Sequence, residues 1–244
     1  MKKETVVIQK EMFSSDKSKI AKYQDLIIGD RSWRRLMVYE FIIGLCSWMP
    51  GALGLLLRSK LYPLLFKKVG TNVNFGIDIA IRHPGKITIG DNVVIDDHCV
   101  LDAKGTDNRG IVIGNGVFLG RNSILSCKNG DIVLGDNVNI GFNSEVFSAS
   151  RVTLERNALV AAYCYFIGGD HDFQSADVSV LDQSRSSRGI TIGEGVWLGA
   201  GVKVLDGIRI AEHSIIGANA VVNRDIPAYS IAVGVPAKVI RKRK

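Results

Sequence analysis

The sequence predicts a mainly β protein, a parallel β-helix of short strands wound into a three-sided prism, with an apolar helical hairpin in front of it. Three observations predict this fold: a six-residue repeat fills most of the chain, prolines are nearly absent from the repeat, and an apolar run with a central break precedes it. We therefore divide the 244-residue chain into an N-terminal segment, residues 1–68, and a β-helix domain with a basic C-terminal tail, residues 69–244.

The N-terminal segment contains the apolar run. Residues 1–30 are polar and mixed, which is typical of an arm or a loose helix. From Leu36 to Leu57 the chain is almost entirely apolar, with Glu40 as its one charge. A helix needs roughly 20 apolar residues to cross a bilayer, but Pro50 and the glycines around it break the run near its middle, where a helix ends or kinks. We therefore predict a helix–break–helix hairpin over residues 36–57.

Three interpretations of this hairpin are open. It lies in one leaflet of a membrane, it caps the β domain, or it spans the membrane. Basic residues at both ends favour the first, because Arg34, Arg35, Arg58 and Lys60 would then lie at lipid headgroups.

The six-residue repeat runs from about Val69 to Ala232. Each unit opens with an aliphatic residue, often followed by glycine. The step is kept without slippage in this run: Ile192, Leu198, Val204, Ile210, Ile216 and Val222. Each unit supplies one short strand whose aliphatic residue points inward, and small or Asn/Asp residues turn the corner, where a positive φ is tolerated. Three units make one coil, and successive coils pair at about 4.8 Å per layer.

Two further features support paired strands. Only Pro84 falls between Pro63 and Pro227, as expected where every strand takes part in a hydrogen-bonded ladder. The stretch shows no helical period of 3.6 residues, which excludes an alternating α/β fold.

The charge and the cysteines limit the partners and the compartment. The chain carries 31 Lys+Arg against 24 Asp+Glu, a formal net charge of +7, with basic residues in the first third and in the tail from Lys238 to Lys244. Aromatic residues do not interleave with these clusters, so we expect no nucleic-acid partner. The four cysteines form no C-x-x-C motif and no cleavable signal peptide is visible, so we expect a cytoplasmic protein, peripheral on the cytoplasmic face of the inner membrane if the hairpin binds lipid.

The most specific motifs lie at the end of the repeat. They are V-W-L-G-A-G-V-K-V-L-D-G (Val196–Gly207), I-I-G-A-N-A-V-V (Ile215–Val222) and D-I-P-A-Y-S-I-A-V-G-V-P-A-K-V-I-R (Asp225–Arg241). These residues resemble the hexapeptide-repeat acyltransferases, the family of galactoside, maltose, serine, xenobiotic and polysaccharide-biosynthesis acetyltransferases. The resemblance covers roughly residues 69–241 and implies a left-handed β-helix, a hand that the spacing alone does not give. It also implies a homotrimer with the active site in the groove between two prisms.

The catalytic prediction rests on one histidine. Acyl transfer from a thioester needs a base that takes a proton from the attacking hydroxyl or amine. His171 stands in F-I-G-G-D-H-D-F, where a coil gives way to a long loop that runs to Gly189. The resemblance implies that this histidine is the general base of a direct transfer. Asp170 and Asp172 flank it, and either could orient the ring or else be solvated loop residues; we also count Asp170 as a substrate contact.

The cosubstrate implied by the resemblance is an acyl-CoA, in the first place acetyl-CoA. Ala200 and Ala218 match corner positions whose backbone meets the pantetheine. Asn223 and Arg224 match the pair near the adenine, although Thr-Lys is commoner there.

The remaining positions that match the family line the phosphates, the acyl group and the acceptor. Lys238 and Arg241 match basic residues that meet the phosphates, or else belong to a solvated tail. Trp197 matches an aromatic wall of the acyl site, or else packs between coils. Asn143 falls near a position that touches the sugar, with Glu145 beside it, but asparagine at a coil corner also has a purely conformational explanation.

Four functions follow from these residues. The leading one is O-acylation of a sugar or glycoconjugate hydroxyl, on a lipid-linked acceptor if the hairpin binds membrane. N-acylation of an amino-sugar, amino-acid or drug acceptor uses the same mechanism. A zinc carbonic anhydrase on this fold needs three gathered histidines, but no H-x₄-H occurs and His98 is far from His171, so we expect no metal. A non-catalytic scaffold is disfavoured by His171 and the coenzyme A motif.

Overall fold

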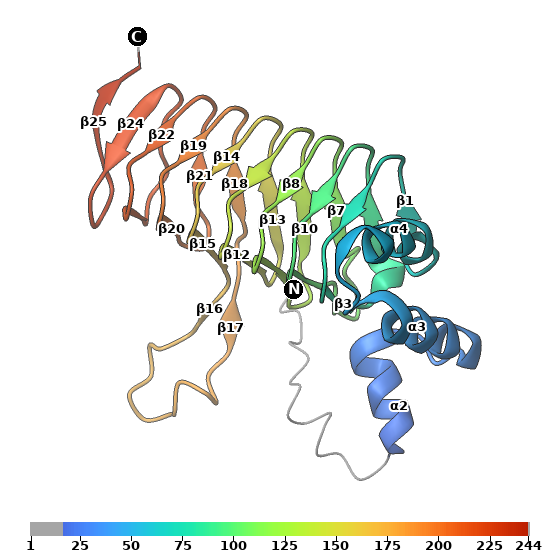
Figure 1. The fold of residues 1–244 in the computed structure, drawn as a ribbon. Coiled ribbons are helices and arrows are strands. Elements are labelled where there is room, and N and C mark those ends of the chain that lie inside the picture. The colour runs from blue at the N-terminus through green and yellow to red at the C-terminus, as the bar shows by residue number, and fades with distance from the viewer. Residues whose placement is uncertain (1–16, 244) are drawn as a thin grey trace.

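The computed structural model describes residues 17–243 of the chain. A long prism of stacked coils carries helices at its N-terminal end, and one loop projects from its side (Figure 1). The predicted mainly β fold, a parallel β-helix with an N-terminal helical part, is confirmed.

Within the described residues, all helices but one precede the first strand, and the exception, η3, lies between β3 and β4. They are α2 (Lys19–Tyr23), the π-helix η1 (Gln24–Ile28), α3 (Trp33–Cys46), α4 (Gly51–Leu61) and the 3₁₀ turns η2 (Tyr62–Leu64) and η3 (Pro84–Lys86).

Three sheets form the faces of the prism, and their strands pair in parallel except for the last, β25, which runs antiparallel to β24. The first face contains β1 (Lys68–Val69), β4 (Ile87–Ile89), β7 (Ile111–Ile113), β10 (Asp131–Leu134), β13 (Arg151–Leu154), β18 (Ile190–Ile192) and β21 (Arg209–Ile210). The second face contains β2 (Asn74–Phe75), β5 (Val94–Ile95), β8 (Phe118–Leu119), β11 (Asn139–Ile140), β14 (Leu159–Val160), β19 (Trp197–Leu198), β22 (Ile215–Ile216), β24 (Ser230–Val233) and β25 (Lys238–Lys242). The third face contains β3 (Ala80–Arg82), β6 (Val100–Asp102), β9 (Ile124–Cys127), β12 (Glu145–Ser148), β15 (Tyr165–Gly168), β20 (Lys203–Val204) and β23 (Val221–Val222). A separate two-stranded ribbon, β16 (Asp170–His171) with β17 (Arg185–Ser186), opens the projecting loop.

The inward positions of the repeat form the core. The aliphatic residues from Ile192 to Val222 that keep the six-residue step are fully buried, as predicted. Burying a side chain of this size stabilises the fold by about 1.5–3 kcal/mol, so the aliphatic ladders account for most of the stability of the prism.

The corners hold residues in the left-handed region of φ. Asn137, Asn143 and Asn157 adopt φ values of 57°, 55° and 59°. His98 and His213 do the same, at 58° and 54°, which agrees with a structural rather than a catalytic role for these two histidines. A short polar side chain is tolerated in this region of φ, and this explains the asparagine spacing in the sequence.

The helical hairpin caps the first coil. Helices α3 and α4 are separated at residues 47–50, where the sequence predicts the break. No coil precedes the first one, so no neighbouring strand donates N–H groups to its outer carbonyl groups. The cap supplies donors instead. The Tyr39 hydroxyl donates to the Ile81 carbonyl at 2.7 Å, and Arg58 Nε donates to the Phe75 carbonyl at 2.9 Å. The hairpin therefore caps the β domain through the inner faces of α3 and α4, and this capping does not exclude contact of their outer faces with a membrane. Within residues 17–243, no helix has the length and apolarity needed to cross a membrane.

One part of the hairpin prediction is wrong. Arg58 does not lie at a headgroup, because it is only 2 % exposed and its guanidinium faces the prism. It falls four residues after the buried Gly54, so the helical period places both on the inner face of α4.

Candidate active site

His171 lies at the root of the projecting loop. Strand β15 ends at Gly168 on the third face, and His171 follows in β16, paired with Arg185 of β17. The chain then returns to the prism at β18 on the first face. The histidine therefore stands at the corner between the third and first faces, and the loop leaves the prism there (Figure 1).

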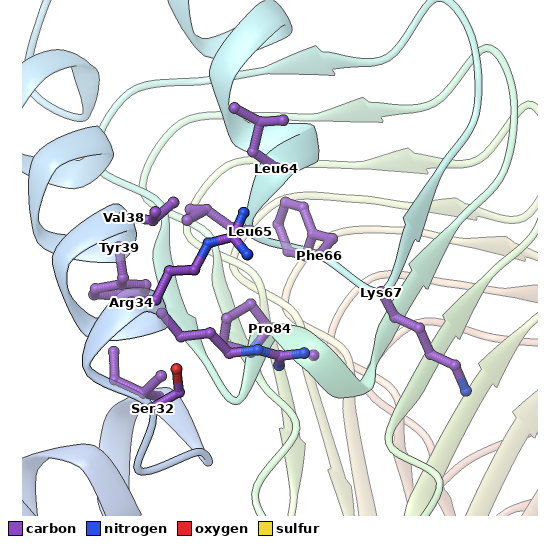
Figure 2. A pocket seen from close by; sticks show the side chains of 12 residues that line it. Ser32, Arg34, Val38, Tyr39, Leu64, Leu65, Phe66, Lys67 and Pro84 are labelled. Atoms are coloured by element: carbon purple, nitrogen blue, oxygen red, sulfur yellow. The ribbon is translucent and has the colours of Figure 1, made fainter.

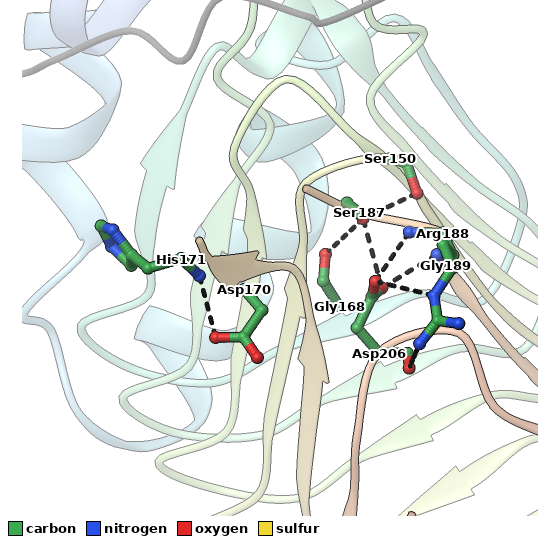
Figure 3. A network of polar contacts seen from close by, with 8 residues as sticks. All are labelled: Ser150, Gly168, Asp170, His171, Ser187, Arg188, Gly189 and Asp206. Atoms are coloured by element: carbon green, nitrogen blue, oxygen red, sulfur yellow. Dashed lines mark hydrogen bonds and ion pairs between the residues drawn. The ribbon is translucent and has the colours of Figure 1, made fainter. Parts of the chain in front are cut away.

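A carboxylate on a later coil holds the returning end of this loop. Asp206 accepts hydrogen bonds from the backbone N–H groups of Arg188 at 2.7 Å and Gly189 at 2.9 Å. The Ser187 hydroxyl lies 3.3 Å from the same carboxylate and 2.9 Å from the carbonyl of Gly168 (Figure 3). Sequence reasoning missed Asp206, although the D-G pair at a coil corner marks it as a residue suited to bonding nearby backbone.

The two flanking carboxylates do not orient the histidine ring. Asp170 accepts from the backbone N–H of His171 at 2.8 Å (Figure 3), and Asp172 accepts from the hydroxyl of Ser184. Nδ1 of His171 is buried and has no hydrogen-bond partner within the described part of the chain. Of the two explanations for these aspartates, the contacts fit a role within the loop, because both carboxylates are engaged with the loop itself.

The corner between the second and third faces presents unused amide groups. Ala200 and Ala218 lie one above the other there, and the carbonyl of Ala200 accepts from the N–H of Asn219 at 2.8 Å. Both alanines are exposed, and their own N–H groups make no hydrogen bond within residues 17–243. A column of free N–H donors suits a ligand with amide carbonyls along its length.

An outward row on the second face leads from this corner to the basic tail. This row consists of one residue from each of four neighbouring strands, in register: Trp197 on β19, Ile215 on β22, Ile231 on β24 and Arg241 on β25. Three strand spacings of about 4.8 Å place the backbone positions of Trp197 and Arg241 roughly 14 Å apart along the prism. Trp197 is 48 % exposed, so its ring is not consumed by packing between coils.

The other basic and polar candidates lie at the C-terminal end. Lys238 is exposed on β25 and pairs with Val233. Asn223 and Arg224 are exposed directly after β23. The structure thus gathers the predicted cofactor residues on the second face, its corner and the last coils.

The predicted acceptor residues lie on or beside the third face. Asn143 turns a corner, and its N–H donates to the carbonyl of Arg121 at 3.0 Å, which fits the conformational explanation. Glu145 lies on β12 and is in register with Tyr165 on β15, the strand that leads to His171. Burial raises the pKa of the Glu145 carboxyl, and the charge of Lys128 opposes this shift.

One chain does not assemble these groups into a single site. His171 occupies the corner between the third and first faces, whereas Ala200 and Ala218 occupy the corner between the second and third. The third face separates these two corners, so one chain does not place His171 beside the free N–H groups of Ala200 and Ala218.

The cysteine and the possible metal ligands offer no alternative centre. Cys164 is buried, its thiol lies 3.3 Å from the Gly199 carbonyl, and burial raises its pKa above the ordinary thiol value. Within residues 17–243, no three or more His, Cys, Asp or Glu side chains gather in a way that could hold a metal ion.

Comparison with known proteins identifies the repeat. Residues 131–165 match the hexapeptide repeat of succinyl-transferase, and residues 189–224 match the bacterial transferase hexapeptide of six repeats. The putative lipopolysaccharide biosynthesis O-acetyl transferase WbbJ of Escherichia coli K12 is 30 % identical over 169 residues, which are 66 % of this chain and 74 % of that protein. The dTDP-4-amino-4,6-dideoxy-D-glucose acyltransferase of Escherichia coli is 30 % identical over 179 residues, 73 % of this chain and 83 % of that protein. The chain belongs to the hexapeptide-repeat transferase family.

This hexapeptide-repeat transferase also has longer relatives and a solved structural neighbour. The probable acetyltransferase Rv3034c of Mycobacterium tuberculosis is 33 % identical over 132 residues, 54 % of this chain but only 44 % of that protein. A variant of AntD, an N-acyltransferase from Bacillus cereus crystallised with dTDP and coenzyme A, shares the fold with a TM-score of 0.55 at 20 % identity, over 82 % of this chain and 92 % of that chain. The predicted family and enzyme class, a hexapeptide-repeat acyltransferase, are confirmed.

Proposed function

We propose that the protein transfers an acyl group, in the first place acetyl, from coenzyme A to a hydroxyl of a sugar or glycoconjugate, with His171 as the general base. The observation that carries this proposal is the position of His171 at the root of the loop, at a prism corner where a second chain can approach. The relative named as a lipopolysaccharide O-acetyl transferase supports a sugar hydroxyl as acceptor.

The chemistry is a direct transfer. The neutral imidazole of His171 takes the proton of the acceptor hydroxyl as its oxygen attacks the thioester carbonyl carbon. The tetrahedral intermediate collapses with cleavage of the carbon–sulfur bond. The leaving thiolate takes up the proton from His171, and the products are the acyl ester and free coenzyme A.

The cofactor contacts follow the second face. The free N–H groups of Ala200 and Ala218 bind the amide carbonyls of the pantetheine, and Trp197 walls the acyl end. Lys238 and Arg241 bind the phosphates through charge-assisted hydrogen bonds. Asn223 and Arg224 lie at the adenine end. The coenzyme A present in the AntD crystal supports a long cofactor on this fold.

The active unit is a homotrimer. The separation of His171 from Ala200 and Ala218 on different corners supports it, because a cyclic arrangement brings the third-to-first corner of one chain to the second-to-third corner of the next. Three equivalent sites result, each built from two chains. Sedimentation velocity is the direct test, since a monomeric active enzyme would contradict this arrangement.

A second candidate is N-acylation of an amino sugar. One relative is named as an acyltransferase of dTDP-4-amino-4,6-dideoxy-D-glucose. The same base and cofactor groove serve an amine, so the two functions differ in the acceptor pocket alone. Nucleotide-linked amino sugars tested beside neutral sugars separate them.

The acceptor of the leading function is lipid-linked, and the protein works in the cytoplasm at the inner face of the membrane. The apolar and basic composition of residues 36–57 and their surroundings supports this part of the proposal. An intact protein that acylates soluble sugars at full rate and ignores lipid-linked ones would contradict it.

The experiment that tests the base is release of free thiol from acetyl-CoA over a panel of sugars, lipid-linked sugars and amines. We expect His171→Ala to lose the acceptor-dependent rate by about a hundredfold or more and to keep its affinity for coenzyme A in calorimetry. His98→Ala is the matched control, because His98 turns a corner on an early coil and should leave the rate unchanged. A His171→Ala enzyme as fast as the wild type would refute the assignment.

A further inference from the structure

The cap helices carry a second apolar face that the prism does not cover. On α3, the buried face holds Leu36 and Ile42, which pack onto the first coil. The opposite face is apolar as well, and its largest members are more than half exposed. These are Trp33, Met37, Phe41 and Trp48 on or beside α3, Leu53 and Leu56 on α4, and Leu64 on η2. A cap that only closes a prism in water would present polar residues on this outer face.

A basic pocket opens beside this face. It encloses about 590 Å³ between α3, the segment that follows α4 and the first coil. Its cations are Arg34, Arg35 and Lys67, and its apolar wall includes Leu64 and Phe66. Figure 2 shows Arg34 reaching in from α3, while Lys67 extends from the chain just before β1. Leu64 belongs both to the pocket and to the exposed apolar face, so the two surfaces are continuous.

The charges in the pocket are only partly matched by the protein. Arg35 pairs with Asp30 at 3.3 Å. Arg34 and Lys67 make no side-chain ion pair or hydrogen bond within residues 17–243. No carboxylate lines the pocket. The site is therefore suited to an anion whose other end is apolar.

We propose that the cap docks on an anionic phospholipid bilayer, with the pocket holding a lipid phosphate and the exposed faces of α3 and α4 lying in the interface. This docking would bring the proposed acyltransferase to a lipid-linked acceptor, and only this biological role of the docking rests on the proposed function. The binding itself involves neither an acyl donor nor His171.

Charge decides between a bilayer and a second copy of the chain as the occupant. A symmetric contact between two caps would bring Arg34 and Lys67 of one chain against the same residues of another, in a protein whose formal net charge is already +7. An anionic headgroup layer instead meets these cations with opposite charge. The exposed Trp33 also fits an interface, where an indole has one apolar side and one N–H that can reach water or a headgroup. Trp48 contributes its exposed apolar ring, while its N–H donates to the Gly44 carbonyl at 3.0 Å.

The test is co-sedimentation of the full-length protein with vesicles of phosphatidylcholine alone and of an equimolar mixture with phosphatidylglycerol. We expect binding to the anionic vesicles only. The double variant Arg34→Gln/Lys67→Gln should bind about thirtyfold more weakly, since each basic residue near an anionic surface contributes about a factor of five. The matched control Arg109→Gln/Arg209→Gln removes two exposed charges elsewhere on the prism and should bind as the wild type does.

The apolar contribution is tested in the same assay. Phe41→Ser/Leu56→Ser should weaken binding by about tenfold or more, because two large side chains no longer enter the interface. Leu181→Ser removes an even more exposed leucine from the projecting loop and should have no effect. In a Trp197→Phe background the cap tryptophans, Trp33 and Trp48, are the only reporters, and brominated lipid should quench them.

Either of two results would overturn the proposal. One is a failure of the vesicle assay, in which the wild-type protein binds neither kind of vesicle or the cap variants bind as tightly as their controls. The other is cap variants that change the oligomeric state while the tryptophans stay unquenched, which would make the face a contact between copies. His171→Ala should bind vesicles like the wild type, so a failure of membrane docking is distinguishable from a failure of the catalytic proposal.

Discussion

The link between the cap and the prism depends on one buried cation, and Arg58→Met measures it. The guanidinium donates from Nε to the Phe75 carbonyl at 2.9 Å, and from Nη1 to the Cys46 carbonyl at 3.0 Å and the Met49 carbonyl at 2.6 Å. Cys46 is the last residue of α3, so the cation also faces the negative end of that helix. Methionine keeps a similar apolar length and removes every donor.

The expected loss follows from the acceptors that are left behind. Phe75 and Cys46 are fully buried, whereas Met49 is partly exposed and its carbonyl can take a water molecule instead. A buried acceptor without a partner costs about 1–3 kcal/mol, and part of this cost is offset because the guanidinium no longer has to be desolvated. We expect Arg58→Met to lower the free energy of unfolding by about 3 kcal/mol, which corresponds to a fall in Tm of about 6–12 °C for a chain of this size.

Thermal unfolding followed by circular dichroism is the assay, with urea unfolding as the second measurement. Lys60→Met is the matched control, because Lys60 is exposed two residues further along α4 and should change stability by less than about 0.5 kcal/mol. Arg58→Lys keeps the charge but has a single donor group, so it should fall between the two. An Arg58→Met protein within about 1 kcal/mol of the control would refute the idea that the cap is held through these carbonyls.

Three further predictions concern the loop root and the N-terminal helices. Asp206→Ala removes the carboxylate that holds the returning loop, so we expect His171 to be misplaced and kcat to fall about tenfold or more, with coenzyme A binding unchanged in calorimetry; equal kcat would contradict the anchoring role. Gly189→Ala should destabilise the protein by about 1–3 kcal/mol in thermal unfolding, because Gly189 has φ +91° and a Cβ there would lie 2.5 Å from a backbone carbonyl. The Arg31 guanidinium, followed by smaller contributions, lowers the pKa of Asp25 from 3.8 to about 2. The stability that depends on this charge is present above about pH 4 and lost as the pH falls toward 2, and since Arg31 is more than half exposed we expect no more than about 1 kcal/mol. Asp25→Asn should therefore be less stable than the wild type at pH 7, and the difference should shrink as the pH falls through about 2; a difference that keeps its full size in acid would contradict the assignment.

Much of the fold is readable from the chain because its order is local. The six-residue step at Ile192, Leu198 and Val204 fixes which side chains point inward, and asparagines such as Asn137 fix where the chain turns. Both features depend on residues a few positions apart, so neither needs knowledge of the rest of the molecule. The break between α3 and α4 is predictable for the same reason, since Pro50 acts on its own helix.

The candidate site divides along the same line. The position of His171 at the root of a loop follows from the interruption of the repeat, but its surroundings do not. Asp170 and Asp172 flank His171 in the sequence, but neither binds its ring. Asp170 accepts from a backbone N–H of the loop, and Asp172 accepts from a serine hydroxyl. The contact that holds the loop root instead comes from Asp206 on a later coil.

The sequence by itself determined the repeat, the β-helix, the helix break and the family motifs at the end of the chain. Only the tertiary structure decided that Arg58 is buried, that Asp206 holds the loop, and that His171 and Ala200 stand on different corners. The physical reason is that these facts depend on which coils stack and where a loop rejoins them. The repeat determines the form of each coil, whereas the lengths of the interruptions determine which distant residues meet.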